Sequence, residues 1–97
     1  MTRKRVVAGN WKLNLGPDEG VALVQALLPL LKDEAACDVV ICPSYLTLSD
    51  VGKTLLGSRI ELGAQNVHWA ESGAFTGEVA PSMLLTIGCR WVILGHS

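Results

Sequence analysis

The chain has 97 residues, of which 49% are hydrophobic and 18% are charged, and its formal net charge is −1. A chain of this length forms one domain at most and has a small core, because it buries only about three-fifths of the surface that it exposes when unfolded. The near-zero charge argues against a nucleic acid or an anionic membrane as partner, no apolar run is long enough to cross a bilayer, and the high apolar content predicts that a partner covers part of the surface.

The first segment with a clear pattern is an apolar run over residues 6–9 that leads into Asn10 and Lys12. A run of small and branched apolar residues without polar alternation is typical of a strand that is buried on both faces. In proteins built on parallel sheets, ligands lie outside the carboxyl ends of the strands, so Asn10 and Lys12 are the first candidate site residues. On this segment alone, a solvated lysine and a turn-forming asparagine explain the two residues equally well.

A helix is predicted to begin at Pro17, which suits a first turn and is followed by two carboxylates that favour the positive end of the helix dipole. Pro29 removes a backbone hydrogen bond and is expected to kink or shorten the last turn, so the helix should end near Lys32 and Asp33. The face that should pack on a sheet is formed by apolar residues at helical spacing, which are Val21, Val24, Leu27, Leu28 and Leu31.

The next stretch repeats the order of strand and helix. Residues 38–43 form a second unalternating apolar run, closed by proline, and Ser44 is placed to cap a second helix. Gly57 lies where the cap at the carboxyl end of that helix belongs, and residues 60–65 give a third strand. The buried face of the second helix is predicted to carry Leu48, Val51 and Leu55.

Residues 66–79 show little periodicity and are predicted to be a long loop, of the kind that is usually functional in a compact domain. A short helix over residues 81–87 follows, with Gly88 behind it, and residues 91–94 form a fourth strand that runs into His96. The alternation of strands and helices predicts an α/β fold with a parallel sheet and right-handed crossovers. A doubly wound sheet is the topological alternative, since four strands in this order do not dictate closure into a barrel.

The cysteines, Cys37, Cys42 and Cys89, are odd in number and lack the paired spacings of a zinc site or a disulfide framework. They are interpreted as reduced, largely buried thiols of a cytoplasmic protein. His68 and His96 do not fall at ligand spacing from any cysteine, so no metal is predicted.

The predicted sheet gathers polar residues from distant parts of the chain. If the strands are parallel neighbours, Asn10, Lys12 and His96 emerge at the same edge, and Gln65 lies near them. A lysine there can hold an anionic oxygen or a phosphate, and a histidine can exchange a proton with a carbonyl-type oxygen. A turn histidine bonded to a backbone carbonyl is the alternative for His96, and its place after an apolar strand, opposite Lys12, favours the functional interpretation.

The sequence resembles the triosephosphate isomerase family in three separated segments, which are residues 8–14 (AGNWKLN), 73–78 (GAFTGE) and 91–97 (WVILGHS). Their order and spacing match those of the family, which makes the resemblance specific. It implies that residues 1–97 are a single partial domain, the first part, about half, of a (β/α)8 TIM barrel that usually takes about 250 residues.

The resemblance also implies an activity and residue roles. The family interconverts dihydroxyacetone phosphate and glyceraldehyde 3-phosphate, in glycolysis and gluconeogenesis, by proton transfer through an enediolate. Lys12 would hold the phosphorylated substrate and the developing enolate charge, with Asn10 beside it as a substrate-proximal amide. His96 would be the neutral electrophile that polarises the carbonyl and relays protons between adjacent oxygens. No cofactor is implied.

The resemblance further implies a homodimer. Thr76 would lie at the tip of the long loop, which in this family reaches into the other subunit near its Asn10 and Lys12. Phe75 would join this interface, although an ordinary loop anchor explains it equally well on sequence alone. Gln65 and Glu78 would support the site and the interface, and His68 would be a structural or surface residue.

The chain departs from the family after Ser97, where the family motif continues into a glutamate. The later glutamate that removes the proton from carbon, the mobile lid and the glycine-rich phosphate-binding turns have no counterpart in these residues. We therefore expect the 97 residues alone to be inactive. The alternative function is a self-associating half-barrel with unpaired edge strands, acting as an assembly or phosphate-binding module.

Overall fold

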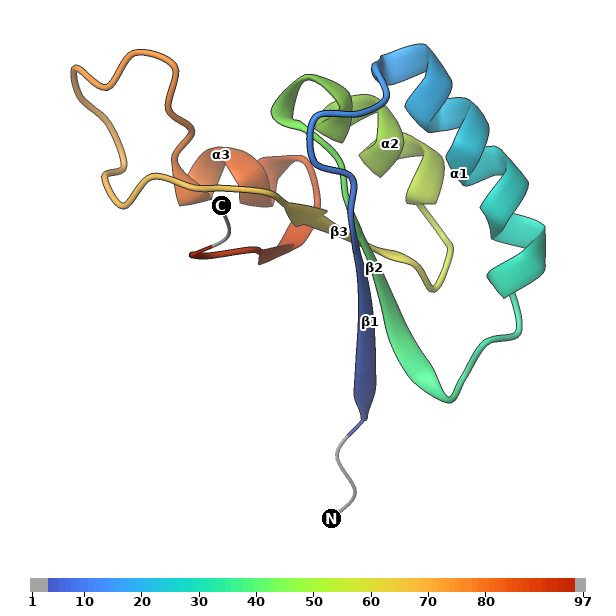
Figure 1. The fold of residues 1–97 in the computed structure, drawn as a ribbon. Helices are drawn as coiled ribbons and strands as arrows, with labels where there is room; N and C mark the ends of the chain where they lie inside the picture. The colour runs from blue at the N-terminus through green and yellow to red at the C-terminus, as the bar shows by residue number, and fades with distance from the viewer. Residues whose placement is uncertain (1–3, 96–97) are drawn as a thin grey trace.

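The computed structural model describes residues 4–95, which form a parallel sheet with helical crossovers (Figure 1). Four strands lie in the order β1-β2-β3-β4, so each strand pairs with the next one along the chain. The predicted alternation of strand and helix is confirmed. The elements are β1 (Arg5–Asn10), α1 (Pro17–Leu31), β2 (Cys37–Cys42), α2 (Tyr45–Leu55), β3 (Glu61–Ala64), α3 (Pro81–Thr86) and β4 (Cys89–Val92).

The pairing of β1 with β2 brings their carboxyl ends level with each other. The register runs from Arg5 opposite Cys37 to Asn10 opposite Cys42, without an interruption. The backbone N–H of Trp11 donates to the carbonyl of Cys42 at 3.1 Å, which extends the pairing one residue past β1. The chain that follows β1 therefore begins its turn directly above the end of β2.

The core lies between the sheet and the helices α1 and α2. Val24 is fully buried on α1, and Leu48, Val51 and Leu55 are buried on α2, so the apolar faces predicted for both helices are confirmed. The helix α1 continues through the exposed Pro29 and ends at Leu31. The buried cluster comprises Val24, Ile41, Leu48, Val51, Leu55, Ile60, Leu62, Ala64, Leu84 and Cys89.

The prediction that the first strand is buried on both faces is wrong. Val6 is 45% exposed and Val7 is 56% exposed, because β1 is an edge of the sheet within residues 4–95 and pairs there with β2 alone. An apolar run indicates that a strand can be buried, but the elements that neighbour the strand determine whether its side chains are covered.

Two further predictions need correction. The fourth strand is Cys89–Val92, which begins two residues before the predicted range of 91–94. The strand begins early because Gly88 adopts a left-handed φ of 85° and returns the chain to the sheet at once. A shift of register between Leu62 and Gly63 accommodates this earlier start.

Ser44 does occupy the position before α2, but among the described residues its hydroxyl makes no hydrogen bond to a helix N–H and lies 3.5 Å from Thr47 Oγ1.

The loop over residues 66–79 contains no helix or strand in the described part of the chain and projects from the sheet (Figure 1). It folds on itself around His68, whose ring stacks on Trp69 at a centroid distance of 4.5 Å and lies 4.3 Å from Phe75. The N–H of His68 donates to the carbonyl of Val79 at 2.9 Å, and its Nδ1 lies 3.8 Å from a carboxylate oxygen of Glu78. His68, predicted to be a structural or surface residue, packs within this loop.

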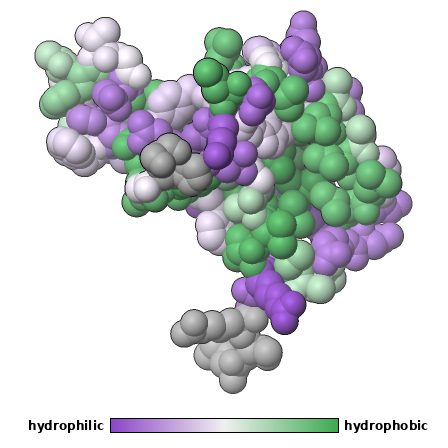
Figure 2. All heavy atoms as spheres, in the orientation of Figure 1, coloured by the Kyte–Doolittle hydropathy of each residue, from purple (hydrophilic) through white to green (hydrophobic). Residues whose placement is uncertain are grey.

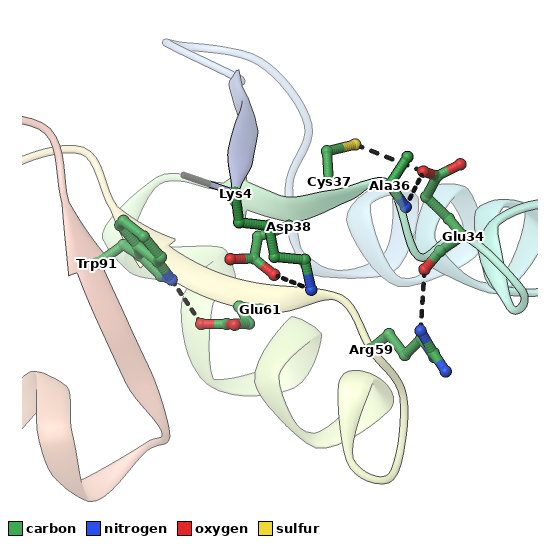
Figure 3. A network of polar contacts seen from close by, with 8 residues as sticks. All are labelled: Lys4, Glu34, Ala36, Cys37, Asp38, Arg59, Glu61 and Trp91. Atoms are coloured by element: carbon green, nitrogen blue, oxygen red, sulfur yellow. Dashed lines mark hydrogen bonds and ion pairs between the residues drawn. The ribbon is translucent and has the colours of Figure 1, made fainter. Parts of the chain in front are cut away.

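A separate polar network links the strands away from the carboxyl edge of the sheet (Figure 3). Lys4 forms an ion pair with Asp38 at 3.0 Å, which joins the start of β1 to β2. The indole N–H of Trp91 donates to a carboxylate oxygen of Glu61 at 2.6 Å, which joins β4 to the first residue of β3. These contacts join neighbouring strands at partly exposed positions, in addition to the backbone pairing.

Much apolar surface stays exposed, as the composition predicts. Figure 2 shows it, in green, over much of the side that carries α1. Leu30 on α1 is 78% exposed. Among the described residues, no helix has the length and apolar character needed to cross a membrane.

Candidate active site

The candidate site begins where β1 ends. Asn10 is the last residue of the strand, and its side-chain oxygen accepts a hydrogen bond of 3.0 Å from the backbone N–H of Lys12. Lys12 is exposed and adopts a left-handed conformation with φ of 55°. Such a conformation costs a residue with a Cβ atom about 1 kcal/mol, so contacts from other residues must hold it.

Gln65 supplies the main contact that holds Lys12. Its side-chain nitrogen donates to the carbonyl of Lys12 at 2.9 Å and to the carbonyl of Cys42 at 2.8 Å. Both amide protons are therefore used, and three strands are tied together just beyond their carboxyl ends. The predicted proximity of Gln65 to Lys12 is confirmed.

The turn from β1 to α1, which we call the lysine loop (residues 11–16), contains a second left-handed residue. Leu15 has φ of 64°, and its carbonyl accepts a hydrogen bond of 3.0 Å from the hydroxyl of Thr47 in the first turn of α2. Within the loop, the side-chain amide of Asn14 donates to the carbonyl of Trp11 at 2.7 Å.

The sequence-based predictions did not include Thr47. It is fully buried, next to Leu48 on the inner side of α2, where an apolar residue would ordinarily lie. A lone hydroxyl beside the apolar positions of a helix was the available signal, because a buried hydroxyl requires a hydrogen-bond partner. The partner, Leu15, lies 32 residues away along the chain, so only the fold reveals it.

The other predicted residues lie apart from Lys12. Phe75, Thr76 and Glu78 belong to the projecting loop, where Phe75 packs on His68 and Glu78 lies beside it. His96 lies outside the described residues. The strand β4 is parallel to β3, and Ile93 donates to the carbonyl of Ala64 at 2.9 Å, so the chain leaves β4 at the same edge of the sheet as Asn10 and Gln65.

The buried thiols of the sheet are not poised for chemistry. All three cysteines are free, and Cys42 and Cys89 are buried. Burial raises the pKa of both of these thiols, so they stay protonated and unreactive near neutral pH. Burial also raises the pKa of Cys37, with help from the charge of Glu34. Within residues 4–95 no group of three or more His, Cys, Asp or Glu side chains is arranged to hold a metal ion.

Parallel strands in sequential order, with a lysine and two side-chain amides at their carboxyl edge, define the class of α/β proteins that build their site at that edge of the sheet. Comparison with known proteins gives the family within this class. Residues 5–97 match the model of the family described as triosephosphate isomerase. The chain belongs to the triosephosphate isomerase family.

The relatives show how much of the protein this chain represents. Triosephosphate isomerases of Clostridium beijerinckii and Clostridium botulinum (strain Eklund 17B) are each 56% identical to it over 95 residues, which are 98% of this chain and 38% of the relative. A crystal structure of triosephosphate isomerase from Bartonella henselae superposes with a TM-score of 0.89 at 34% identity, over 98% of this chain and 39% of that one. The chain is thus the first part of a TIM barrel, and its share is nearer two-fifths than the expected half.

Proposed function

We propose that this chain is the amino-terminal part of a cytoplasmic enzyme that interconverts dihydroxyacetone phosphate and glyceraldehyde 3-phosphate by proton transfer through an enediolate. The observation that carries the proposal is the placement of Lys12. In a chain of this family, Lys12 lies at the carboxyl edge of the sheet, and its backbone is held by Asn10 and Gln65. A charge fixed in advance stabilises developing negative charge without the cost of reorganisation.

Each residue of the site has a defined task in the proposed reaction. The ammonium group of Lys12 attracts the phosphorylated substrate and stabilises the enediolate oxygens. The side-chain oxygen of Asn10 accepts the N–H of Lys12, which leaves its amide protons to donate to a substrate oxygen. His96, as a neutral imidazole, polarises the carbonyl and moves a proton between the two adjacent oxygens.

The base that takes the proton from carbon is assigned to a glutamate beyond these 97 residues, together with the lid and the phosphate-binding turns. Without a base, proton transfer at carbon has no agent. We therefore expect the 97 residues alone to be inactive, and to contribute to activity when a second polypeptide supplies the rest of the barrel.

The proposed enzyme is a homodimer in which Phe75, Thr76 and Glu78 contact the partner and Gln65 supports the contact region. Two properties of the projecting loop support this assignment. It is preorganised by the packing of Phe75 against the ring of His68, so little conformational entropy is lost on docking. It also presents apolar surface to solvent, since Trp69 is 87% exposed.

A complementation assay tests the proposed function. The purified chain, a polypeptide that supplies the later strands and loops, and their mixture are each assayed for interconversion of the two triose phosphates. Activity of the mixture that is lost with Lys12→Met supports the proposal. Turnover by the 97 residues alone at an ordinary enzymatic rate would refute the expected inactivity, and an inactive full polypeptide would refute the function itself.

The self-associating module remains the second candidate, and the edges of the sheet favour it. Within residues 4–95, β1 and β4 each pair on one side alone, and Val7 and Val92 are exposed there. Exposed apolar strands of this kind pair readily with a second copy. An intact cellular mass of 10.3 kDa, with self-association in solution and no companion chain, would support the module over the enzyme.

A further inference from the structure

We propose that Thr47 is a positioning residue for Lys12, acting through the backbone carbonyl of Leu15. The inference rests on the proposed function, in which Lys12 holds the substrate. Thr47 stands on α2 and touches no candidate site residue through its hydroxyl, so its role is exerted through the lysine loop.

The conformation of the lysine loop depends on two matching hydrogen bonds. Lys12 and Leu15 are the only residues other than glycine with a positive φ in the part of the chain that the structure describes. The carbonyl of each accepts a hydrogen bond from a side chain of a distant element, from Gln65 for Lys12 and from Thr47 for Leu15. Gln65 therefore secures the start of the loop, and Thr47 secures its end.

The surroundings of Thr47 fix the direction of its hydroxyl. Its side chain is fully buried, and its methyl group lies against Gly20 on α1, only 2.7 Å from where a Cβ atom on that glycine would stand. The ring of Trp11, the first residue of the lysine loop, approaches the same point to 3.1 Å. Thr47, Gly20 and Trp11 thus form one packed contact, and the single hydroxyl proton of Thr47 is donated to Leu15.

Loss of the hydrogen bond between Thr47 and Leu15 should displace Lys12 while the fold stays intact. Leu15 is half-buried, so its unpaired carbonyl would favour a rotated peptide that reaches water. Without its second anchor, the loop can leave the doubly left-handed conformation, and the backbone that carries the Lys12 side chain is displaced. A small displacement of a binding charge weakens substrate binding even when the core is intact.

The test compares Thr47→Val, which keeps the shape and removes the hydroxyl, with Thr47→Ser, which keeps the hydroxyl and removes the methyl group. Thr54→Val is the matched control, since the Thr54 hydroxyl on the same helix bonds within the helix, to the carbonyl of Asp50. The variants are made in the full polypeptide as its gene encodes it. The readouts are KM and kcat for the triose phosphates, and hydrogen exchange of the Lys12 amide, which donates to Asn10.

For Thr47→Val we expect KM to rise about tenfold with a smaller change in kcat, and exchange of the Lys12 amide to quicken about tenfold. Thr47→Ser should stay within about twofold of the unaltered protein, and Thr54→Val should match it. A merely destabilised protein would lower the active fraction, and so the apparent kcat, at constant KM.

Unchanged KM and unchanged Lys12 exchange in Thr47→Val would overturn the inference, and so would a Thr47→Ser variant that is impaired as much as Thr47→Val. If the unaltered polypeptide has no isomerase activity, the proposed function fails and the catalytic role of Thr47 fails with it. The exchange measurement then still reports whether Thr47 holds the lysine loop, so the two failures are distinguished.

Discussion

Single side chains, most of all Gln65, determine the geometry of the candidate site. Its amide nitrogen contacts the lysine loop and the end of β2 at once, with both bonds shorter than 3 Å. It offsets the backbone cost of the left-handed Lys12, and it does so without contributing a charge that would compete with the lysine for substrate.

Gln65→Glu tests this role, because it keeps the size of the side chain and replaces both donors with acceptors. At neutral pH the carboxylate would face the carbonyls of Lys12 and Cys42, so we expect the free energy of unfolding to fall by about 2–3 kcal/mol. Urea titration measures the change. Asn66→Asp, at the exposed neighbouring position, introduces the same charge and should change the stability by less than about 0.5 kcal/mol. Equal effects of the two substitutions would contradict the assigned role.

At the scale of elements, the contact between α1 and α2 decides where the lysine loop lies. A methyl group at Gly20 would stand 2.7 Å from the Thr47 methyl, 3.1 Å from the Trp11 ring and 3.5 Å from Val51. Gly20 therefore permits the close approach of the helices, although alanine is the better residue inside a helix by about 1 kcal/mol.

Gly20→Ala should accordingly destabilise the protein by about 1–2 kcal/mol, because overpacking outweighs the gain in helix propensity. In a Thr47→Ser background the clashing methyl is gone, and the same substitution should cost at least about 1 kcal/mol less. Chemical unfolding of the four variants gives the coupling. Gly16→Ala, whose added Cβ would meet nothing within 4 Å, is the control. Additive effects of Gly20→Ala and Thr47→Ser would rule out the direct contact.

The elements also show what the sequence could and could not predict. Helical spacing identified the buried faces around Val24 and Leu48, because a 3.6-residue period is a local property of the chain. The exposure of Val7 was not predictable, since an edge strand and a covered strand carry the same apolar run. Gln65 could be placed near Lys12 from the order of parallel strands, whereas the hydrogen bond from Thr47 to Leu15 depends on how α2 packs against the loop.

For the whole molecule, the distribution of exposed apolar side chains indicates that further polypeptide covers part of this surface. Leu13 is 97% exposed on the lysine loop, and Leu46 is 78% exposed at the start of α2, both near the carboxyl edge of the sheet. Apolar surface at this edge, beside a projecting loop with an exposed Trp69, is the pattern of an interface rather than of a free surface.

Thr76→Arg tests the interface in the full polypeptide. If the loop tip is enclosed by a second subunit, a guanidinium there is buried without a partner, and dimerisation should weaken at least about 100-fold. Sedimentation measures the dissociation, and circular dichroism should show an unchanged fold, because Thr76 is exposed within the described chain. Ser82→Arg, at an exposed position of α3, adds the same charge outside the loop and should leave the dimer intact. If the partner's loop lies beside the proposed site, activity should fall together with the dimer. A monomeric variant with full activity would separate catalysis from assembly and would show that Asn10, Lys12 and Gln65 are held by the subunit itself.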